Sequence, residues 1–234
     1  MHRIHSVAKY QIADNRNGVL VYYAVLIGLA LIMVATPNWN STGTTSLSGV
    51  SSMIFIFVLG LNCFRSSFLF CQANNISRRS FYFATILSLL VLAVILSLCD
   101  LVLDAVLGRY PFYEGFFEQI YPASGFAKIL WTTALFTFSA SLGWMITMIY
   151  YRANPWVKVL VSISPIVVIT LAGYLHQRTD GVFGYALFVL LGKALGFSAQ
   201  GPNPYPAMAT FVLASMAIWA VNYLLMRKTP VRPY

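Results

Sequence analysis

Charged side chains are scarce in this 234-residue chain, and acidic ones are the scarcest. Six Asp and Glu residues stand against 15 Lys and Arg, and charged residues make up 9% of the sequence. A typical soluble domain carries about 25% charged residues. Together with 59% hydrophobic residues, this composition excludes an ordinary soluble fold and predicts a membrane protein.

Motifs of several enzyme classes are also missing. The sequence contains no His-Glu-x-x-His metal motif, no Gly-x-Ser-x-Gly nucleophile elbow and no Gly-x-x-x-x-Gly-Lys-Ser/Thr phosphate loop. The histidines are too scattered to hold a metal, and the three cysteines lack metal spacing and are interpreted as small apolar residues. We therefore predict no catalytic site, no metal site and no cofactor in this chain.

Long apolar runs take up most of the sequence. Each is close to or above the ~20 residues that cross ~30 Å of hydrocarbon as a helix. The pattern predicts an all-α, polytopic fold with six transmembrane helices in a single domain, residues 1–234. The predicted spans are Val19–Ala35, Val50–Cys71, Phe81–Leu103, Ile129–Tyr151, Trp156–Leu175 and Ala207–Met226.

The basic residues are distributed unevenly between the two sides of these spans. If the N-terminus is cytoplasmic, the outer side holds four, Arg109, Lys128, Arg178 and Lys193, and the inner side holds the other 11 of the 15. This asymmetry is the positive-inside pattern, so the excess positive charge indicates topology and contact with anionic membrane lipids rather than with nucleic acid. We predict a multi-pass cell-membrane protein with both termini in the cytoplasm.

The N-terminal segment is polar but patterned. In residues 2–17, apolar side chains recur at three- and four-residue spacing, which favours a short amphipathic helix lying in the cytoplasmic interface; a disordered basic segment is the alternative. The run Gly18–Ala35 is longer than the apolar region of a signal peptide, and five further spans follow, so we predict that it is not cleaved.

The link between spans two and three is the most polar cytoplasmic segment within the predicted bundle. Arg65–Cys71 is amphipathic enough to form a short helix that projects past the membrane, and Arg65 either extends to the lipid headgroups or pairs with a neighbour. Asn74 and Asn75 suit a helix end, and Ser77 suits the N-cap of the third span. This segment is predicted to offer a docking element to a cytoplasmic partner.

Two acidic residues, Asp100 and Asp104, lie four residues apart on one face of the third span. Carboxylates at membrane depth are costly and usually functional, so the pair is a candidate site. The alternative is that the helix emerges there and water covers both. The aromatic-rich loop Arg109–Lys128 that follows is predicted to form an interfacial belt or a short helix on the outer leaflet.

The second half of the chain carries helix breakers. Only Ala153–Pro155 separates spans four and five, which predicts a tight antiparallel hairpin, and Pro165 predicts a kink in span five. The apolar run Val182–Leu191 is about half a span long and is punctuated by glycines, which is typical of a re-entrant element.

These features together resemble the membrane subunit of bacterial ABC transporters of the ABC-2 type. The resemblance rests on the N-terminal helix over residues 2–17, six spans with both ends inside, the Cys71–Ser80 link and the apolar half-helix 181–197. The short motif Phe70-x-x-x-Asn74-Asn75-Ile76-Ser77-Arg78 followed by Phe81-Tyr82-Phe83 is similar to small permeases that work with a separate ATPase.

The resemblance implies two permease subunits, identical or paralogous, on two cytoplasmic ABC ATPase subunits, with ATP and Mg bound by the ATPase. It implies export of a hydrophobic or amphipathic substrate, with an antimicrobial or cytolytic peptide expected. A membrane adaptor without transport activity and an intramembrane lipid-modifying enzyme using Asp100 and Asp104 remain alternatives. The residues that the resemblance assigns to ATPase coupling are Ser66, Gln72, Asn74, Asn75, Ile76, Ser77, Arg78 and Arg79, and those assigned to an outer gate are Gly181, Gly184, Lys193 and Gly196.

Overall fold

A computed structural model describes residues 2–36, 46–122, 125–198 and 201–227, without the side chains of His2, Arg3 and Arg65. The described residues form eight helices and one pair of very short strands. Six helical stretches are long and apolar enough to cross a membrane. The predicted all-α fold with six spans is confirmed to this extent.

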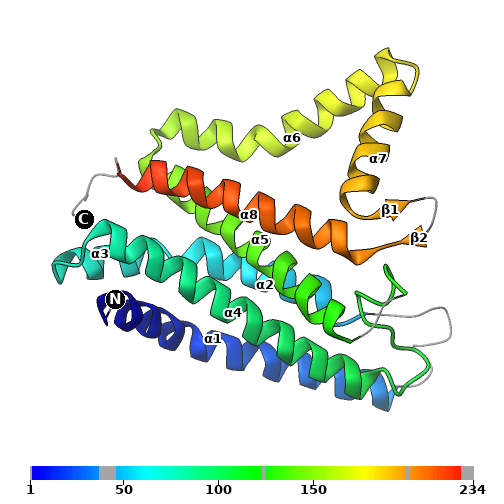
Figure 1. Ribbon diagram of the computed structural model, residues 1–234, viewed down its shortest axis with the longest axis horizontal. Helices are drawn as coiled ribbons and strands as arrows, with labels where there is room; N and C mark the ends of the chain where they lie inside the picture. The colour runs from blue at the N-terminus through cyan, green and yellow to red at the C-terminus, as the bar shows by residue number, and fades with distance from the viewer. Residues whose placement is uncertain (1, 37–45, 123–124, 199–200, 228–234) are drawn as a thin grey trace.

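Five long helices lie side by side in one bundle (Figure 1). They are α1 (His2–Ala35), α2 (Gly49–Asn62), α4 (Arg78–Leu107), α5 (Phe126–Arg152) and α8 (Pro204–Arg227). Helix α5 is central, because it packs against α2, α4 and α8. Its fully buried Phe136 and Trp144 are large apolar side chains at the centre of the core.

The bundle has two ends that differ in chemistry. At one end α1 begins, α8 ends and the short helix α3 (Arg65–Ala73) leads into α4 (Figure 1). We call it the link end. At the other end α4 finishes with Asp100 and Asp104 and α5 begins. We call this the acidic end.

Small residues bring α2 and α5 into close approach. A Cβ atom added at Gly60 would lie 2.2 Å from the carbonyl oxygen of Ala140, and one at Gly143 would lie 2.3 Å from that of Phe57. Glycine at these two positions lets the backbones touch, as small residues do where membrane helices cross. The Thr147 hydroxyl then donates to the Leu61 carbonyl across the crossing, at 2.6 Å.

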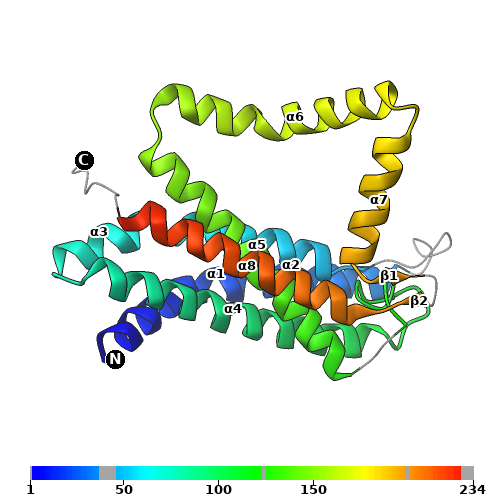
Figure 2. The same cartoon turned by 45° about the horizontal axis from the view of Figure 1, so that its top comes forward.

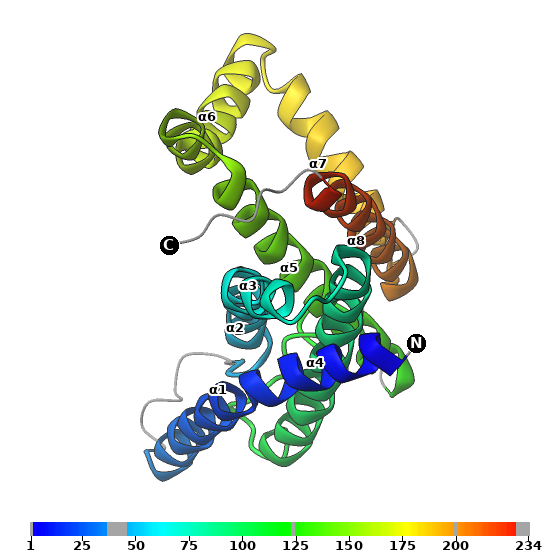
Figure 3. The same cartoon turned by 90° about the vertical axis from the view of Figure 1, so that its left-hand side faces the viewer.

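The N-terminal segment is helical as predicted, but it is continuous with the first span rather than a separate helix, and its position in a membrane interface stays a prediction. Residues 2–17 are the first half of α1, which runs without a break to Ala35 and changes direction along its length (Figure 3). Gly18 is the only strong helix breaker near the expected junction, and a single glycine costs a helix only about 1 kcal/mol. The apolar face packs on protein, since Val7, Ala8 and Gln11 are buried.

Helices α6 (Pro155–Arg178) and α7 (Val182–Ala194) stand away from the bundle (Figure 2). Neither has a buried residue. The predicted tight hairpin of spans four and five is therefore wrong, because Asn154 and Pro155 turn α6 away from α5 with an extended backbone at Asn154. Helix α6 contains Pro165 and is bent near its middle, as predicted (Figure 2).

The half-span element before the last helix is present as α7. After it, the strands β1 (Phe197–Ser198) and β2 (Gly201–Pro202) pair antiparallel, a detail that the all-α prediction missed. Whether α7 re-enters a membrane stays a prediction. Most of the connection between the first two predicted spans, residues 37–45, lies outside the described residues.

Candidate functional site

The link between α3 and α4 is built by helix caps. The chain bends at Cys63 and Phe64 and starts α3, the short helix predicted over Arg65–Cys71. Asn75 follows the end of α3 in the left-handed conformation, with φ of 54°. Ser77 caps α4, because its hydroxyl accepts from the Ser80 backbone N–H at 3.2 Å. The predicted helix end and N-cap are confirmed.

Most of the predicted coupling residues face outward together. Ser66, Asn74, Asn75, Ser77 and Arg79 are exposed, and Gln72, Ile76 and Arg78 are half-buried. Two of the half-buried side chains donate hydrogen bonds to backbone carbonyls. Gln72 donates to the nearby Ile76 carbonyl at 3.0 Å, and Arg78 donates to the Arg227 carbonyl at the end of α8, at 3.2 Å. The side chain of Arg65 lies outside the described residues, so both alternatives for it, extension to the lipid headgroups and pairing with a neighbour, stay predictions.

Aromatic side chains anchor this polar surface to the core. Phe64, Phe68 and Phe81 are all 0% exposed, and the first two rings stack with centroids 4.9 Å apart. On the other side of α3, Phe70 stacks on Tyr10 of α1 at 4.9 Å. Displacing α3 therefore displaces α1 and α4 with it, since packed aromatic groups resist separation.

A groove of about 440 Å³ opens between the start of α1 and the link. Its walls mix apolar and polar groups, with Val7, Tyr10 and Phe70 beside Ser6 and Asn74. It lies next to the exposed coupling residues. The link end thus combines a protruding polar turn with an adjacent recess, which suits docking of another protein.

At the acidic end, Asp100 joins three helices. Its Oδ1 accepts from the Tyr23 hydroxyl of α1 at 2.8 Å and from the Ser52 hydroxyl of α2 at 2.9 Å. Asp100 itself is 3% exposed. The Tyr23 hydroxyl also lies 3.0 Å from the Leu96 carbonyl. These bonds fix the relative positions of α1, α2 and α4.

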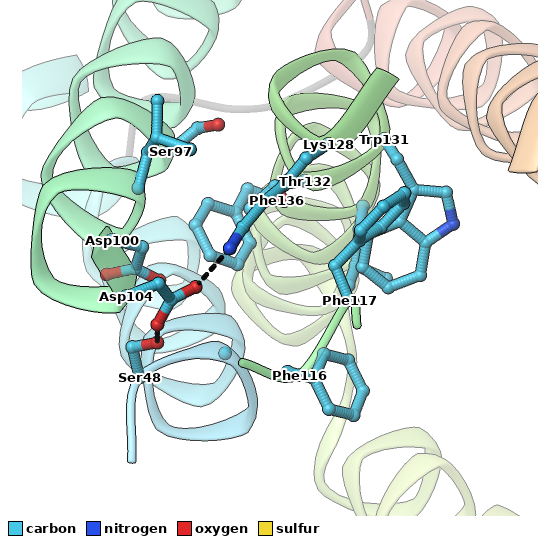
Figure 4. A pocket seen from close by; sticks show the side chains of 13 residues that line it. Ser48, Ser97, Asp100, Asp104, Phe116, Phe117, Lys128, Trp131, Thr132 and Phe136 are labelled. Atoms are coloured by element: carbon cyan, nitrogen blue, oxygen red, sulfur yellow. Dashed lines mark hydrogen bonds and ion pairs between the residues drawn. The ribbon is translucent and has the colours of Figure 1, made fainter. Parts of the chain in front are cut away.

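Asp104 joins α4 to α5 and to Ser48 at the start of α2 (Figure 4), and it also bonds to the loop between α4 and α5. Its Oδ2 pairs with the Lys128 ammonium at 2.8 Å, and Lys128 also pairs with Glu118 at 2.6 Å. The Oδ1 atom of Asp104 accepts from the Ser48 hydroxyl at 2.8 Å and from the Tyr113 hydroxyl. Burial and the neighbouring Asp104 carboxylate raise the pKa of Tyr113, so the phenol stays a donor at neutral pH.

The alternative that water covers both carboxylates is wrong for the chain in this arrangement. The Asp104 side chain is 8% exposed and that of Lys128 is 9% exposed. The expected interfacial belt does not hold for Tyr113, Phe117 and Tyr121, which are buried, whereas Tyr110 is exposed. In the described part of this loop the chain forms turns rather than a helix, and it packs over the acidic end.

The sequence reasoning missed Lys128 and Glu118 as partners of Asp104. The charge distribution identifies Lys128 only as one of the basic residues on the outer side. A signal was present, because Lys128 opens an apolar helix and Glu118 lies in the loop just before it, while a buried cation needs a carboxylate nearby. The tyrosine partners had no such signal, because Tyr23 and Tyr113 are separated from the two aspartates by loops or whole helices.

The predicted gate residues are spread along α7 rather than gathered. Gly181 starts the helix with φ of 87°, and Gly184 lies against His176, whose Nδ1 would be 2.1 Å from an added Cβ. At the far end Lys193 is exposed, and the Gly196 carbonyl accepts from the Asn203 N–H at 2.9 Å. These four residues therefore mark the two ends of α7, and their role as an outer gate stays a prediction.

No group of three metal-ligating side chains is found in the described residues. Comparisons with protein-family models, with curated proteins and with solved structures find no match for this chain. The candidate sites are therefore the exposed link and the buried polar cluster at the acidic end.

Proposed function

We propose that this chain is the membrane subunit of an ATP-driven exporter of the ABC-2 type, with the link end in the cytoplasm. The observation that carries the proposal is the α3–α4 link. It is an exposed polar turn on a short helix, rigidly anchored by Phe64, Phe68 and Phe81. A separate ATPase that binds ATP and Mg would dock on it.

The contacts of α3 supply a path for mechanical coupling. The rings of Phe64 and Phe68 pack edge-on against Phe81 of α4 and against Tyr151 at the end of α5. Movement of the link by an ATPase would therefore shift α4 and α5. Packed helices respond to such a shift by sliding between discrete arrangements.

A two-fold assembly is part of the proposal. Helix α6 is a span-length apolar helix with no buried side chain, and it stands apart from its own bundle (Figure 1). This leaves an apolar surface for a second permease copy or a paralogue, with lipid covering the rest. The path between two such subunits would be lined by apolar and aromatic side chains, which suits a hydrophobic or amphipathic peptide as cargo.

An intramembrane enzyme that uses Asp100 and Asp104 is disfavoured by the geometry. The cavity beside these residues is about 10 Å³, room for about one water molecule. Asp104 is also held by Lys128 at 2.8 Å. A membrane adaptor without transport activity shares the link surface, so only a functional experiment separates it from an exporter.

That experiment changes the link and measures coupling. Asn75→Gly together with Arg79→Ala removes two exposed side chains and keeps the left-handed backbone at residue 75. Arg78 is left alone, because it holds the end of α8. We expect the full-length variant, purified with its ATPase, to lose most substrate-stimulated ATP hydrolysis and transport.

The matched control is Arg109→Ala with Gln119→Ala, which removes two exposed side chains at the acidic end. The control should retain both activities. Normal coupling in the link variant would overturn the assignment of this surface. Normal ATPase binding by an unmodified chain that supports no transport of any apolar or amphipathic peptide would favour the adaptor.

A further inference from the structure

The acidic end has more buried acid than base. Asp104 and Glu118 share the one ammonium group of Lys128, at 2.8 and 2.6 Å. Asp100 lies one helical turn from Asp104 and has no cation bonded to it. The described groups that bond to Asp100 are the hydroxyls of Tyr23 and Ser52, and they carry no charge. Lys128 lines the same cavity, but its ammonium group pairs with Asp104 and Glu118.

One oxygen of Asp100 is left without a partner. Oδ1 accepts both hydroxyl bonds, whereas the buried Oδ2 has no hydrogen-bond partner within the described structure. Asp100 lines the small cavity of about 10 Å³ between α4 and α5, with Asp104, Lys128 and Thr132 (Figure 4). An ionised carboxylate oxygen beside a cavity this small loses most of its hydration and gains no hydrogen bond from the protein in exchange, which costs free energy.

We propose that Asp100 binds a proton on Oδ2 while the acidic end is closed as seen here. The proton comes from water, and the product is a neutral carboxylic acid. Oδ1 keeps its two bonds from Tyr23 and Ser52, and the new O–H points to the cavity side. The cluster of Asp100, Asp104, Glu118 and Lys128 then carries one negative charge instead of two.

The surrounding charges favour a proton over a metal cation. Lys128 already places a positive charge in the same cavity lining, so a second full cation would be repelled. In the part of the chain that the structure describes, no three His, Cys, Asp or Glu side chains gather closely enough to hold a metal ion. A proton needs only the one oxygen that is unpartnered.

The other ionisable groups near Asp100 do not replace this proton. Tyr22 and Tyr23 of α1 are neutral phenols that point hydroxyls at Ser52 and Asp100. Tyr113 of the loop donates to Asp104 rather than to Asp100. Protonation of Asp100 therefore removes the negative charge of its carboxylate, with which no described basic side chain forms an ion pair.

Opening the acidic end would admit water and release the proton, because hydration of the carboxylate removes the desolvation cost of its ionised form. The helices α1, α2 and α4 that meet at Asp100 would separate more easily in the ionised state. In an exporter, alkaline medium at this end would favour the open arrangement. This last consequence rests on the proposed function, but the proton site itself does not.

The test is infrared spectroscopy of the full-length protein in lipid nanodiscs, with ¹³C-labelled aspartate. We expect a carbonyl band of a protonated carboxylic acid at pH 6, shifted by the label and absent from Asp100→Asn. The band should survive in Glu118→Gln. Absence of any label-sensitive acid band at pH 6 in the unmodified protein would overturn the proposal, and so would its survival in Asp100→Asn.

The wild-type spectrum is decisive even if the variant does not fold. Asp14 and Asp180 are exposed and Asp104 is paired with Lys128, so a protonated aspartate at pH 6 identifies Asp100, because an exposed aspartate with an ordinary pKa of about 3.9 is ionised at that pH. The measurement needs no ATPase and no cargo. It therefore stands if the exporter fails, and its failure leaves the link assignment intact.

Discussion

At the acidic end, two buried carboxylates, Asp100 and Asp104, and the Lys128 ammonium group are bonded to groups of four helices, and Glu118 of the covering loop completes the cluster. At the link end, the described basic side chains are exposed or half-buried and pair with no carboxylate. Both ion pairs found in the described residues belong to the acidic end. At the link end, Arg78 and Arg152 donate to the backbone carbonyls of Arg227 and Leu225 instead.

This difference separates a buried structural network from the surface that we propose as a binding surface. A buried network with one member removed leaves charges unpaired and costs several kcal/mol. An exposed charge contributes about 1 kcal/mol or less to folding and is available to a partner. Substitutions at the acidic end should therefore reduce stability, and substitutions on the link surface should reduce coupling.

The largest loss of stability is expected for Lys128→Met. The change removes the ammonium group shared by Asp104 and Glu118 and leaves a buried carboxylate unpaired. We expect about 3 kcal/mol, the lower end for a broken buried pair, because the Glu118 side chain is 37% exposed. Denaturant titration of the purified protein measures it.

The matched control for this change is Lys193→Met on α7, where the lysine is exposed. It should alter stability by less than about 0.5 kcal/mol. The double variant Lys128→Met, Asp104→Leu should recover part of the loss. Equal effects of the two lysine substitutions would break the comparison.

A loss of about 2 kcal/mol, typical of overpacking, is expected for Gly143→Ala. The added Cβ would lie 2.3 Å from the Phe57 carbonyl oxygen, so α2 and α5 must separate. This crossing lies toward the link end and shows that this end is held by backbone approach rather than by charge. Gly173→Ala on α6, with nothing within 4 Å of its added Cβ, should leave the denaturation midpoint unchanged.

A loss of about 1.5 kcal/mol is expected for Tyr113→Phe at neutral pH, the value of a hydrogen bond to a charged group. The pKa of Tyr113 is raised in the folded state, so its stabilising contribution is full below the unfolded pKa of about 10 and falls as pH rises above it. Between pH 10 and 12 the wild type should therefore lose more stability than the variant. Parallel pH profiles would contradict this.

The smallest effect on stability is expected for Asn75→Gly with Arg79→Ala. Both side chains are exposed, so the denaturation midpoint should shift by less than about 0.5 kcal/mol, although coupling to the ATPase is lost. A large drop in stability would mean that the link is a structural element and would remove the contrast with the acidic end.

Much of the fold was readable from hydrophobic length. The predicted span Ile129–Tyr151 appears as Phe126–Arg152 and Trp156–Leu175 as Pro155–Arg178, because a run of apolar residues sets both the helix and its approximate ends. The N-cap at Ser77 was readable for a local reason, since a serine hydroxyl bonds a backbone N–H three residues on.

Other features depend on contacts between distant segments. The pairing of Lys128 with Asp104 and of Gln11 with Thr85 and Ser88 joins helices whose relative rotation no local pattern fixes. The separation of α6 from α5 likewise could not be read from Ala153–Pro155, because a short connection permits several crossing angles.

The central claim is that the link end receives an ATPase, and site-specific photo-cross-linking tests it most directly. A photoreactive residue is placed at Ser66 on α3 or, for comparison, at Arg109 by the acidic end; both positions are exposed. In membranes of the native host, we predict a cross-link from Ser66 to a nucleotide-hydrolysing subunit and none from Arg109. Capture of that subunit from Arg109 alone, or from neither position, would contradict the account.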